Sequence, residues 1–342
     1  MKRRFILILH NLSDFYKHNK RIINFIIQLA ISILLIILLL NLIDIPDMLL
    51  LLKNINVYYF ILLLILITID RIFMAYKWLL LLRVKYKNIS FFTVIKIYYV
   101  GTFVGFFLPT TVGGDLVRVL KLQKEKHKGS DALSSVILER ILGFIASAIL
   151  ASITTILLIF LFKLNIWHFL IIAAVVLFVL ALILIISFNK TLVSKIEKSE
   201  KLSGNFLVNN LKKFYLSYAE YKDNKGLIAL FLILSIIEQL IPVIANYLAA
   251  LALNLKIPLI YFTLITPTVQ LISKVPISFE GIGVTEGLMV YFFTLFGLAK
   301  TDAFSIGILG HIAVIIATLP ALVFYFRDIK ASLMQDKNEV KR

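Results

Sequence analysis

The stretch that decides the fold is Phe107-Leu108-Pro109-Thr110-Thr111-Val112-Gly113-Gly114-Asp115-Leu116-Val117-Arg118, which interrupts the apolar run Ile89–Leu122. Pro109 cannot continue an incoming helix, and the two glycines permit positive φ angles and close backbone approaches. The aspartate then stands in the opening turn of the next helix, where a carboxylate suits the helix dipole. The stretch predicts two helices joined by a sharp turn, which we call the first hairpin.

A second stretch has the same construction. It reads Lys274-Val275-Pro276-Ile277-Ser278-Phe279-Glu280-Gly281-Ile282-Gly283-Val284-Thr285-Glu286-Gly287, inside the apolar run Pro258–Leu298, which we call the second hairpin. A proline again closes one helix, glycines shape the turn, and a carboxylate opens the next helix. Each flanking run would be about 27 Å long as a helix, so this hairpin can either cross a bilayer or turn back.

The composition places the whole chain in a membrane. Of its 342 residues 61% are hydrophobic and only 16% are charged, whereas soluble domains carry about 25% charged residues. Six uninterrupted apolar runs are long enough to cross as helices. They are Ile22–Ile43, Val57–Leu82, Ala132–Phe162, Ile166–Phe188, Leu227–Leu253 and Asp302–Phe326. We therefore expect an all-α polytopic integral membrane protein with about six full spans plus two re-entrant hairpins broken by Gly and Pro, eight hydrophobic segments in total.

The basic residues predict the topology. Lys and Arg number 36 against 19 Asp and Glu, a net charge of +17, and most of them fall in a few connections and at the two ends. The positive-inside rule places these segments in the cytoplasm if the first hairpin enters and returns from that side. Both termini are then cytoplasmic, in the plasma (cytoplasmic) membrane, and the second hairpin enters from the opposite side. We expect one transmembrane domain, 1–342, with halves of about 1–162 and 163–330 in inverted order and a basic cytoplasmic tail, 331–342.

This pattern also predicts the partners. The basic excess lies beside membrane spans, which favours anionic lipid at the cytoplasmic face over nucleic acid, and residues of about 205–222 have the spacing of an interfacial helix. The chain has no cysteine, which excludes disulfides and thiolate chemistry, and it shows no nucleotide-binding or metal-binding motif. We expect no cofactor and no catalytic residue.

Ionisable residues inside apolar spans are candidate site residues, because a charge there is costly unless it is paired or lines water. Arg118 lies one helical turn after Asp115, so the pair can grip a phosphate or simply neutralise each other. Glu238 is followed four residues later by Pro242, which predicts a kink, and this position favours a buried acid over a ligand. The residues expected to be buried include six acids and four bases: Asp70, Asp115, Glu139, Glu238, Glu280 and Glu286 against Arg71, Arg118, Arg140 and Lys274. This surplus of acids predicts a cationic headgroup, proton coupling or acids that are protonated. The candidate residues for substrate binding or transport are Pro109, Gly113, Gly114, Asp115, Arg118, Glu139, Arg140, Lys274, Pro276, Glu280, Gly281, Gly283 and Glu286.

Taken in order, the two hairpin motifs and Glu139-Arg140 resemble the flippase-like transmembrane region of the lysylphosphatidylglycerol synthases, over nearly the whole chain. In that family Phe279-Glu280-Gly281 would replace part of a glycine run. The resemblance implies movement of aminoacylated phospholipids between leaflets, with lysine attached to phosphatidylglycerol by a separate cytoplasmic domain. We expect no such domain here, because the sequence ends soon after the last apolar run.

Three functions remain open from the sequence. The first is a translocator for a membrane lipid with a polar or charged headgroup: a phospholipid, an aminoacyl-phospholipid or a polyprenyl-phosphate-linked lipid. The second is an enzyme or membrane component of aminoacyl-lipid synthesis, of the phosphatidylglycerol lysyltransferase type, or of lipid-linked glycan synthesis, with a separate lipid-modifying enzyme as partner. The third is a scaffold without transport, in which Arg118 and Glu286 matter only for stability.

Overall fold

The computed structural model describes residues 26–105, 113–125, 127–189 and 206–324, and in these ranges the chain is helical with no strand. The all-α prediction is confirmed for them. The first 25 residues, Pro109 and the basic tail 331–342 lie outside the described residues.

The predicted spans are long apolar helices. Five helices among the described residues are long and apolar enough to cross a membrane. They are α3 (Val57–Leu82), α6 (Gly129–Phe162), α7 (Trp167–Ser187), the pair α10 (Lys225–Glu238) and α11 (Leu240–Ala252), and α14 (Lys300–Thr318). Each corresponds to one predicted run, so a polytopic helical membrane protein is confirmed.

The first predicted span differs from the expectation. A helix covers Ile26–Leu40, and the chain then bends by 100° into α2 (Ile45–Lys53), so the two together make the sixth candidate span. The sequence analysis placed α2 in a connection. Its start has a clear local cause, because Asp44 accepts a hydrogen bond from the backbone N–H of Asp47 at 3.0 Å and a proline stands in the first turn.

The two hairpins are pairs of short helices. The first consists of α4 (Phe91–Gly105, 15 residues) and α5 (Gly113–Lys124, 12 residues). The second consists of α12 (Leu259–Ser273, 15 residues) and α13 (Val284–Leu295, 12 residues). At about 1.5 Å per residue these helices are roughly 18 to 22 Å long, less than the ~30 Å of a hydrocarbon core. Their lengths favour turning back over crossing.

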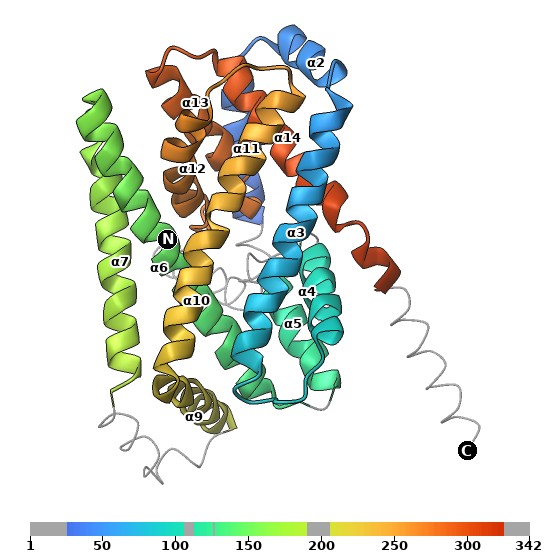
Figure 1. The fold of residues 1–342 in the computed structure, drawn as a ribbon, viewed down its shortest axis with the longest axis vertical. Coiled ribbons are helices and arrows are strands. Elements are labelled where there is room, and N and C mark those ends of the chain that lie inside the picture. Colours follow the sequence, from blue (N-terminus) through green and yellow to red (C-terminus); the bar gives the residue numbers. More distant parts are fainter. Residues whose placement is uncertain (1–25, 106–112, 126, 190–205, 325–342) are drawn as a thin grey trace, which may run out of the picture.

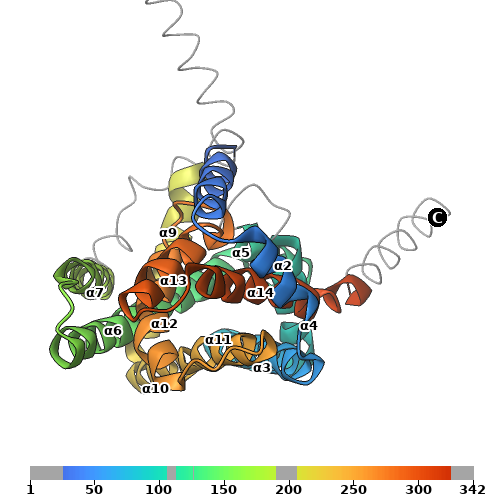
Figure 2. The same ribbon diagram turned by 90° about the horizontal axis from the view of Figure 1, so that it is seen from above.

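The hairpins lie at opposite ends of the molecule. In Figure 1, α4 and α5 stand at the end that also carries α9 (Phe206–Ala219), whereas α12 and α13 stand at the end that carries α2. From above, α3, α10 and α11 form one layer, and α6, α12, α13 and α14 form a second layer facing it (Figure 2). Among the described residues, two apolar segments, a hairpin and a further span thus follow one another twice, and the two hairpins lie at opposite ends.

Glycines let the two helices of the first hairpin touch through their backbones. A Cβ atom on Gly114 would lie 2.7 Å from the carbonyl oxygen of Gly101, and one on Gly105 would lie 3.0 Å from the Cα of Gly114. Gly101 and Gly105, four residues apart on α4, thus form a small-residue face that packs against α5. This contact brings the start of α5 against α4.

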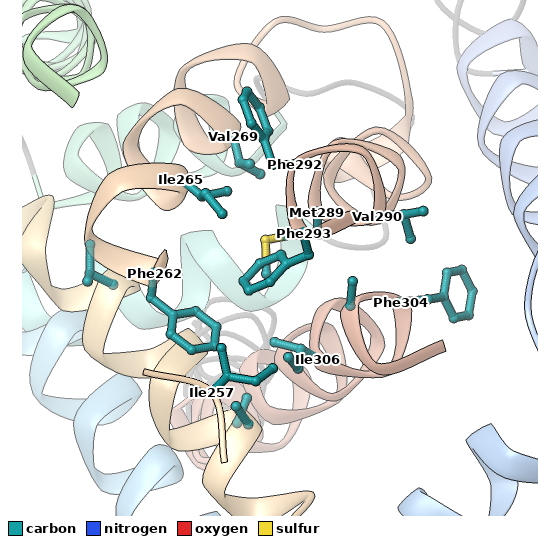
Figure 3. Close-up of a cluster of buried hydrophobic side chains, with 14 of the residues drawn as sticks. Ile257, Phe262, Ile265, Val269, Met289, Val290, Phe292, Phe293, Phe304 and Ile306 are labelled. Atoms are coloured by element: carbon teal, nitrogen blue, oxygen red, sulfur yellow. The ribbon is translucent and has the colours of Figure 1, made fainter. Parts of the chain in front are cut away.

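The second hairpin is anchored on two sides. On one side, Phe262 of α12 and Phe293 of α13 pack with Ile306 of α14 in a buried apolar cluster (Figure 3). On the other side it meets the helix Ile26–Leu40, whose Ser32 hydroxyl accepts a hydrogen bond from the N–H of Phe279 at 2.8 Å. The turn between α12 and α13 is therefore held in place from both sides.

Candidate functional site

Both hairpins border one central cavity of about 690 Å³, lined by residues of both helix layers. The first hairpin contributes Gly105 and Gly114, and the second contributes much of its turn. Most of the predicted site residues line it: Gly114, Asp115, Arg118, Glu139, Arg140, Lys274, Pro276, Glu280 and Gly281. Three others, Gly113, Gly283 and Glu286, are buried without lining the cavity. Pro109 falls outside the described residues.

Four charged side chains form what we call the Arg118 cluster. Arg118 donates to Asp115 Oδ1 at 2.6 Å and to Glu139 Oε2 at 2.7 Å. Arg140 donates from Nε to the other oxygen of Asp115, and the hydroxyl of Tyr98 lies 3.4 Å from Glu139 Oε1. Two carboxylates and two guanidinium groups balance one another, so the cluster as a whole is neutral.

The two arginines of this cluster differ in accessibility. The guanidinium group of Arg118 lies 4.8 Å from the ring centre of Trp78 and 4.6 Å from that of Tyr98, and only 6% of its side chain is exposed. The side chain of Arg140 is 41% exposed. Because the edges of Arg118 bind carboxylates and the group lies against aromatic rings, its geometry favours a structural role, whereas Arg140 can reach a ligand.

On the α10–α11 side of the cavity lies a second group of polar side chains, which we call the Lys274 cluster. Lys77 donates to Glu238 at 3.1 Å, and Lys274 donates to the Ser147 hydroxyl at 2.6 Å and to Gln239 Oε1 at 3.2 Å. These residues come from α3, α10, α6 and the start of the second hairpin turn. Two lysines face one carboxylate, so this cluster carries an excess positive charge.

A helix break brings the Lys274 cluster together. The span that covers α10 and α11 is interrupted at Gln239, three residues before Pro242. Proline lacks an N–H group and its ring collides with the carbonyl group four residues earlier, which here belongs to Glu238. The predicted kink is therefore present, and both Glu238 and Gln239 line the cavity beside it.

Asp70 and Arg71, neighbours on α3, form an ion pair beside the cavity. Arg71 NH2 lies 2.8 Å from Asp70 Oδ2, and both residues line the cavity. Asp70 Oδ1 and Arg71 Nε are buried and have no hydrogen-bond partner among the described residues. Each residue therefore keeps one polar atom that is not used by the ion pair.

Glu286 shapes the second hairpin turn. One carboxylate oxygen accepts the N–H of Gly283 at 2.7 Å, which closes the start of α13, and the other lies 2.9 Å from His311 Nε2. The side chain of Glu286 is fully buried, whereas His311 lines the cavity. One oxygen is bound within the turn, and the other lies beside His311 without a hydrogen bond among the described residues. This carboxylate therefore stabilises the turn and meets the cavity lining at His311.

Glu280 has the opposite character. Its backbone adopts a φ of 50°, which is rare for a residue with a side chain, and its side chain is exposed and lines the cavity. The charged groups that act on it most are Arg140 and His311. A carboxylate of the second hairpin thus lies within electrostatic reach of α6, which also carries part of the Arg118 cluster.

The sequence analysis missed Lys77, Gln239 and His311 as site residues. Lys77 is only 2% exposed and takes part in an ion pair, which makes it a buried base in the middle of the molecule. The predicted count of four bases left out Lys77, which reduces the surplus of acids. The signal for Lys77 was available, since it is a charged residue inside the apolar run Val57–Leu82.

Residues 25–321 match the family described as the lysylphosphatidylglycerol synthase TM region. The chain belongs to this family. The match covers both hairpins and nearly all of the described spans, so the resemblance drawn from the hairpin motifs is confirmed. No curated protein and no solved structure matches the chain. Membership in this family supports a membrane protein connected with lipid modification or lipid movement.

Proposed function

We propose that the protein translocates a lipid with a polar headgroup between the leaflets of the cytoplasmic membrane. The observation that carries the proposal is that two glycine-containing hairpins at opposite ends of the molecule both line one charged cavity surrounded by apolar helices. Transporters use broken helices of inverted halves to build a polar site near the middle of a bilayer. The family match is compatible with this role.

The polar groups of the cavity can offset the main energetic cost of lipid translocation, which is the dehydration of the headgroup. A charged or zwitterionic headgroup loses its hydration in the hydrocarbon core, at a cost that paired charges and hydrogen bonds can offset. The Arg118 cluster, the Lys274 cluster and Glu280 provide such groups along one cavity. The headgroup would occupy the cavity while the acyl chains stay in the surrounding lipid, and phospholipids, aminoacyl-phospholipids and polyprenyl-phosphate-linked lipids all fit this description.

A second function follows from the family description, which names a synthase. In that case the protein is a membrane component of aminoacyl-lipid or lipid-linked glycan synthesis and hands its lipid to a separate modifying enzyme. The two functions differ in one observable. A translocator moves lipid when it is the only protein in a vesicle, whereas a synthesis component alone does not.

The first prediction concerns Arg140. In liposomes that contain the purified protein and a tail-labelled fluorescent phospholipid, we expect the inner label to become accessible to a membrane-impermeant quencher. Replacing Arg140 with alanine removes the exposed guanidinium group while Asp115 keeps its bond to Arg118, so lipid movement should fall by about tenfold or more. Arg83→Ala serves as the control, because Arg83 is an exposed arginine outside the cavity.

Two outcomes of this experiment would contradict the proposal. One is that the wild-type protein moves none of the lipids tested, and the other is that Arg140→Ala and Arg83→Ala move them as fast as the wild-type protein does. A comparison of the elution profiles in detergent shows whether a slow variant is still folded.

The second prediction concerns topology. Lys124 at the end of α5 and Lys256 before α12 are both exposed, and the proposed orientation puts them on opposite sides of the membrane. Because the chain has no cysteine, Lys124→Cys and Lys256→Cys each introduce a single thiol. In intact cells an impermeant maleimide should label position 256 and spare position 124 until the cells are opened. Labelling of position 124 from outside would reverse the proposed cytoplasmic location of the first hairpin and of both termini.

A further inference from the structure

The ammonium group of Lys274 differs from the other buried cations of the cavity. Arg118 and Lys77 each bind a carboxylate directly, whereas the hydrogen-bond partners of Lys274 are two neutral oxygens, those of Ser147 and Gln239. An ammonium group has three N–H donors. Two are used in this way, and the residue lines the cavity, so its third donor can bind a ligand.

The charges around Lys274 leave its own charge uncompensated. Two carboxylates act on the ammonium group, those of Glu238 and Asp70, and so do two further cations, Lys77 and Arg140. Each carboxylate already has its own basic partner, at 3.1 Å for Glu238 and 2.8 Å for Asp70. Lys77 balances Glu238 and Arg71 balances Asp70, whereas Arg140 binds Asp115 in the Arg118 cluster. Among these groups, the positive charge of Lys274 is left over.

From this excess charge we propose that the Lys274 cluster binds the phosphate group of the transported lipid. An ammonium group with a spare donor and an uncompensated charge attracts an oxyanion, and phosphate is the oxyanion that membrane lipids carry. The inference rests on the proposed function and adds the place where the phosphate shared by the candidate lipids binds. A phosphate-free glycolipid of the same acyl chains should therefore be a poorer substrate.

The position of Lys274 at the end of α12 would couple a bound phosphate to movement of the second hairpin. Lys274 is the residue that ends α12 and begins the turn of the second hairpin, whereas Ser147 belongs to α6 and Gln239 to the break between α10 and α11. A phosphate bound to Lys274 is thus attached to the hairpin, and its other neighbours belong to different elements. Movement of the hairpin turn relative to α6 would carry the phosphate with it.

The test compares two lipids in the same proteoliposomes: tail-labelled phosphatidylglycerol and tail-labelled monoglucosyldiacylglycerol. We expect the wild-type protein to move the first at least about tenfold faster than the second. Lys274→Gln should remove most of this preference, and Lys274→Arg, which keeps the charge, should retain it. Lys256→Gln, an exposed lysine outside the cavity, should behave like the wild-type protein.

A second variant should raise the affinity for phosphate, whereas Lys274→Gln should lower it. It also tests the proposal if Lys274→Gln does not fold. Glu238→Gln removes the carboxylate that neutralises Lys77, so the cluster gains positive charge and should hold phosphate more tightly. Binding is measured as the rise in melting temperature of the detergent-purified protein with inorganic phosphate and, separately, with dihexanoyl phosphatidylglycerol. Stabilisation by both compounds assigns the site to phosphate itself, and stabilisation by the lipid alone assigns it to the lipid headgroup. Either result supports the proposal if it weakens in Lys274→Gln or strengthens in Glu238→Gln.

The failures are distinguishable. If the wild-type protein moves both lipids equally fast and neither compound stabilises it, the phosphate site is refuted while translocation stands. If phosphate or the short lipid binds through Lys274 but no lipid moves, the proposed function fails and the site remains. If Lys274→Gln slows both lipids by the same factor, Lys274 supports the fold of the turn and does not select for phosphate.

Discussion

Replacing Gly114 with alanine is expected to prevent the first hairpin from forming its native contact. The added Cβ atom would lie 2.7 Å from the carbonyl oxygen of Gly101 and 3.3 Å from its carbonyl carbon. Both are backbone atoms of a helix, so they cannot move aside as a side chain would. Overpacking against side chains already costs about 1–3 kcal/mol, and separating two helix backbones would also disturb Arg118, which lies one turn further along α5. We expect a large loss of folded protein.

A matched substitution isolates the cause. Gly143 also lies in a helix and lines the same cavity, but a Cβ atom added to it would meet nothing within 4 Å. Gly143→Ala should leave the melting temperature in detergent unchanged or raise it, since alanine favours helix over glycine by about 1 kcal/mol. Equal melting temperatures for Gly114→Ala and Gly143→Ala would show that α4 and α5 are not in backbone contact.

The outline of the fold was readable because it depends on local properties. Apolar length predicts a spanning helix, and Pro and Gly inside an apolar run predict a break, so the spans and both hairpins appear where expected. The bend of 100° before α2 was not predicted. It arises from a polar cap at Asp44 inside a short connection, and a count of apolar residues does not register such a cap.

The sequence predicts which residues belong to the site but not which of them pair with one another. Charges inside apolar spans identify residues that must be paired, and most of those named do line the cavity. The partners were not readable, because ion pairs join residues that are distant in sequence, such as Lys77 and Glu238, 161 positions apart. Nor does the sequence show that Glu286 would be used up by its own turn and by His311.

Replacing Arg118 with alanine is expected to lower the stability of the protein as well as its transport activity. The guanidinium group is the common partner of Asp115 and Glu139, and its removal leaves Glu139 buried without a basic partner within ion-pair distance among the described residues. Breaking a buried pair in this way costs about 3–5 kcal/mol. If instead Arg118 served mainly to bind the headgroup, the variant would lose transport and keep its melting temperature.

A double-mutant cycle decides between these roles. Glu139→Gln removes the charge that Arg118→Ala leaves uncompensated, so the double variant should be more stable than the sum of the two single effects implies. Thermal unfolding in detergent measures the coupling, and Arg83→Ala, on an exposed residue, gives the baseline for losing an arginine. Additive effects would mean that the pair contributes nothing to stability. Arg118 would then be available to bind the substrate. The first hairpin would offer an anion-binding group in addition to Lys274.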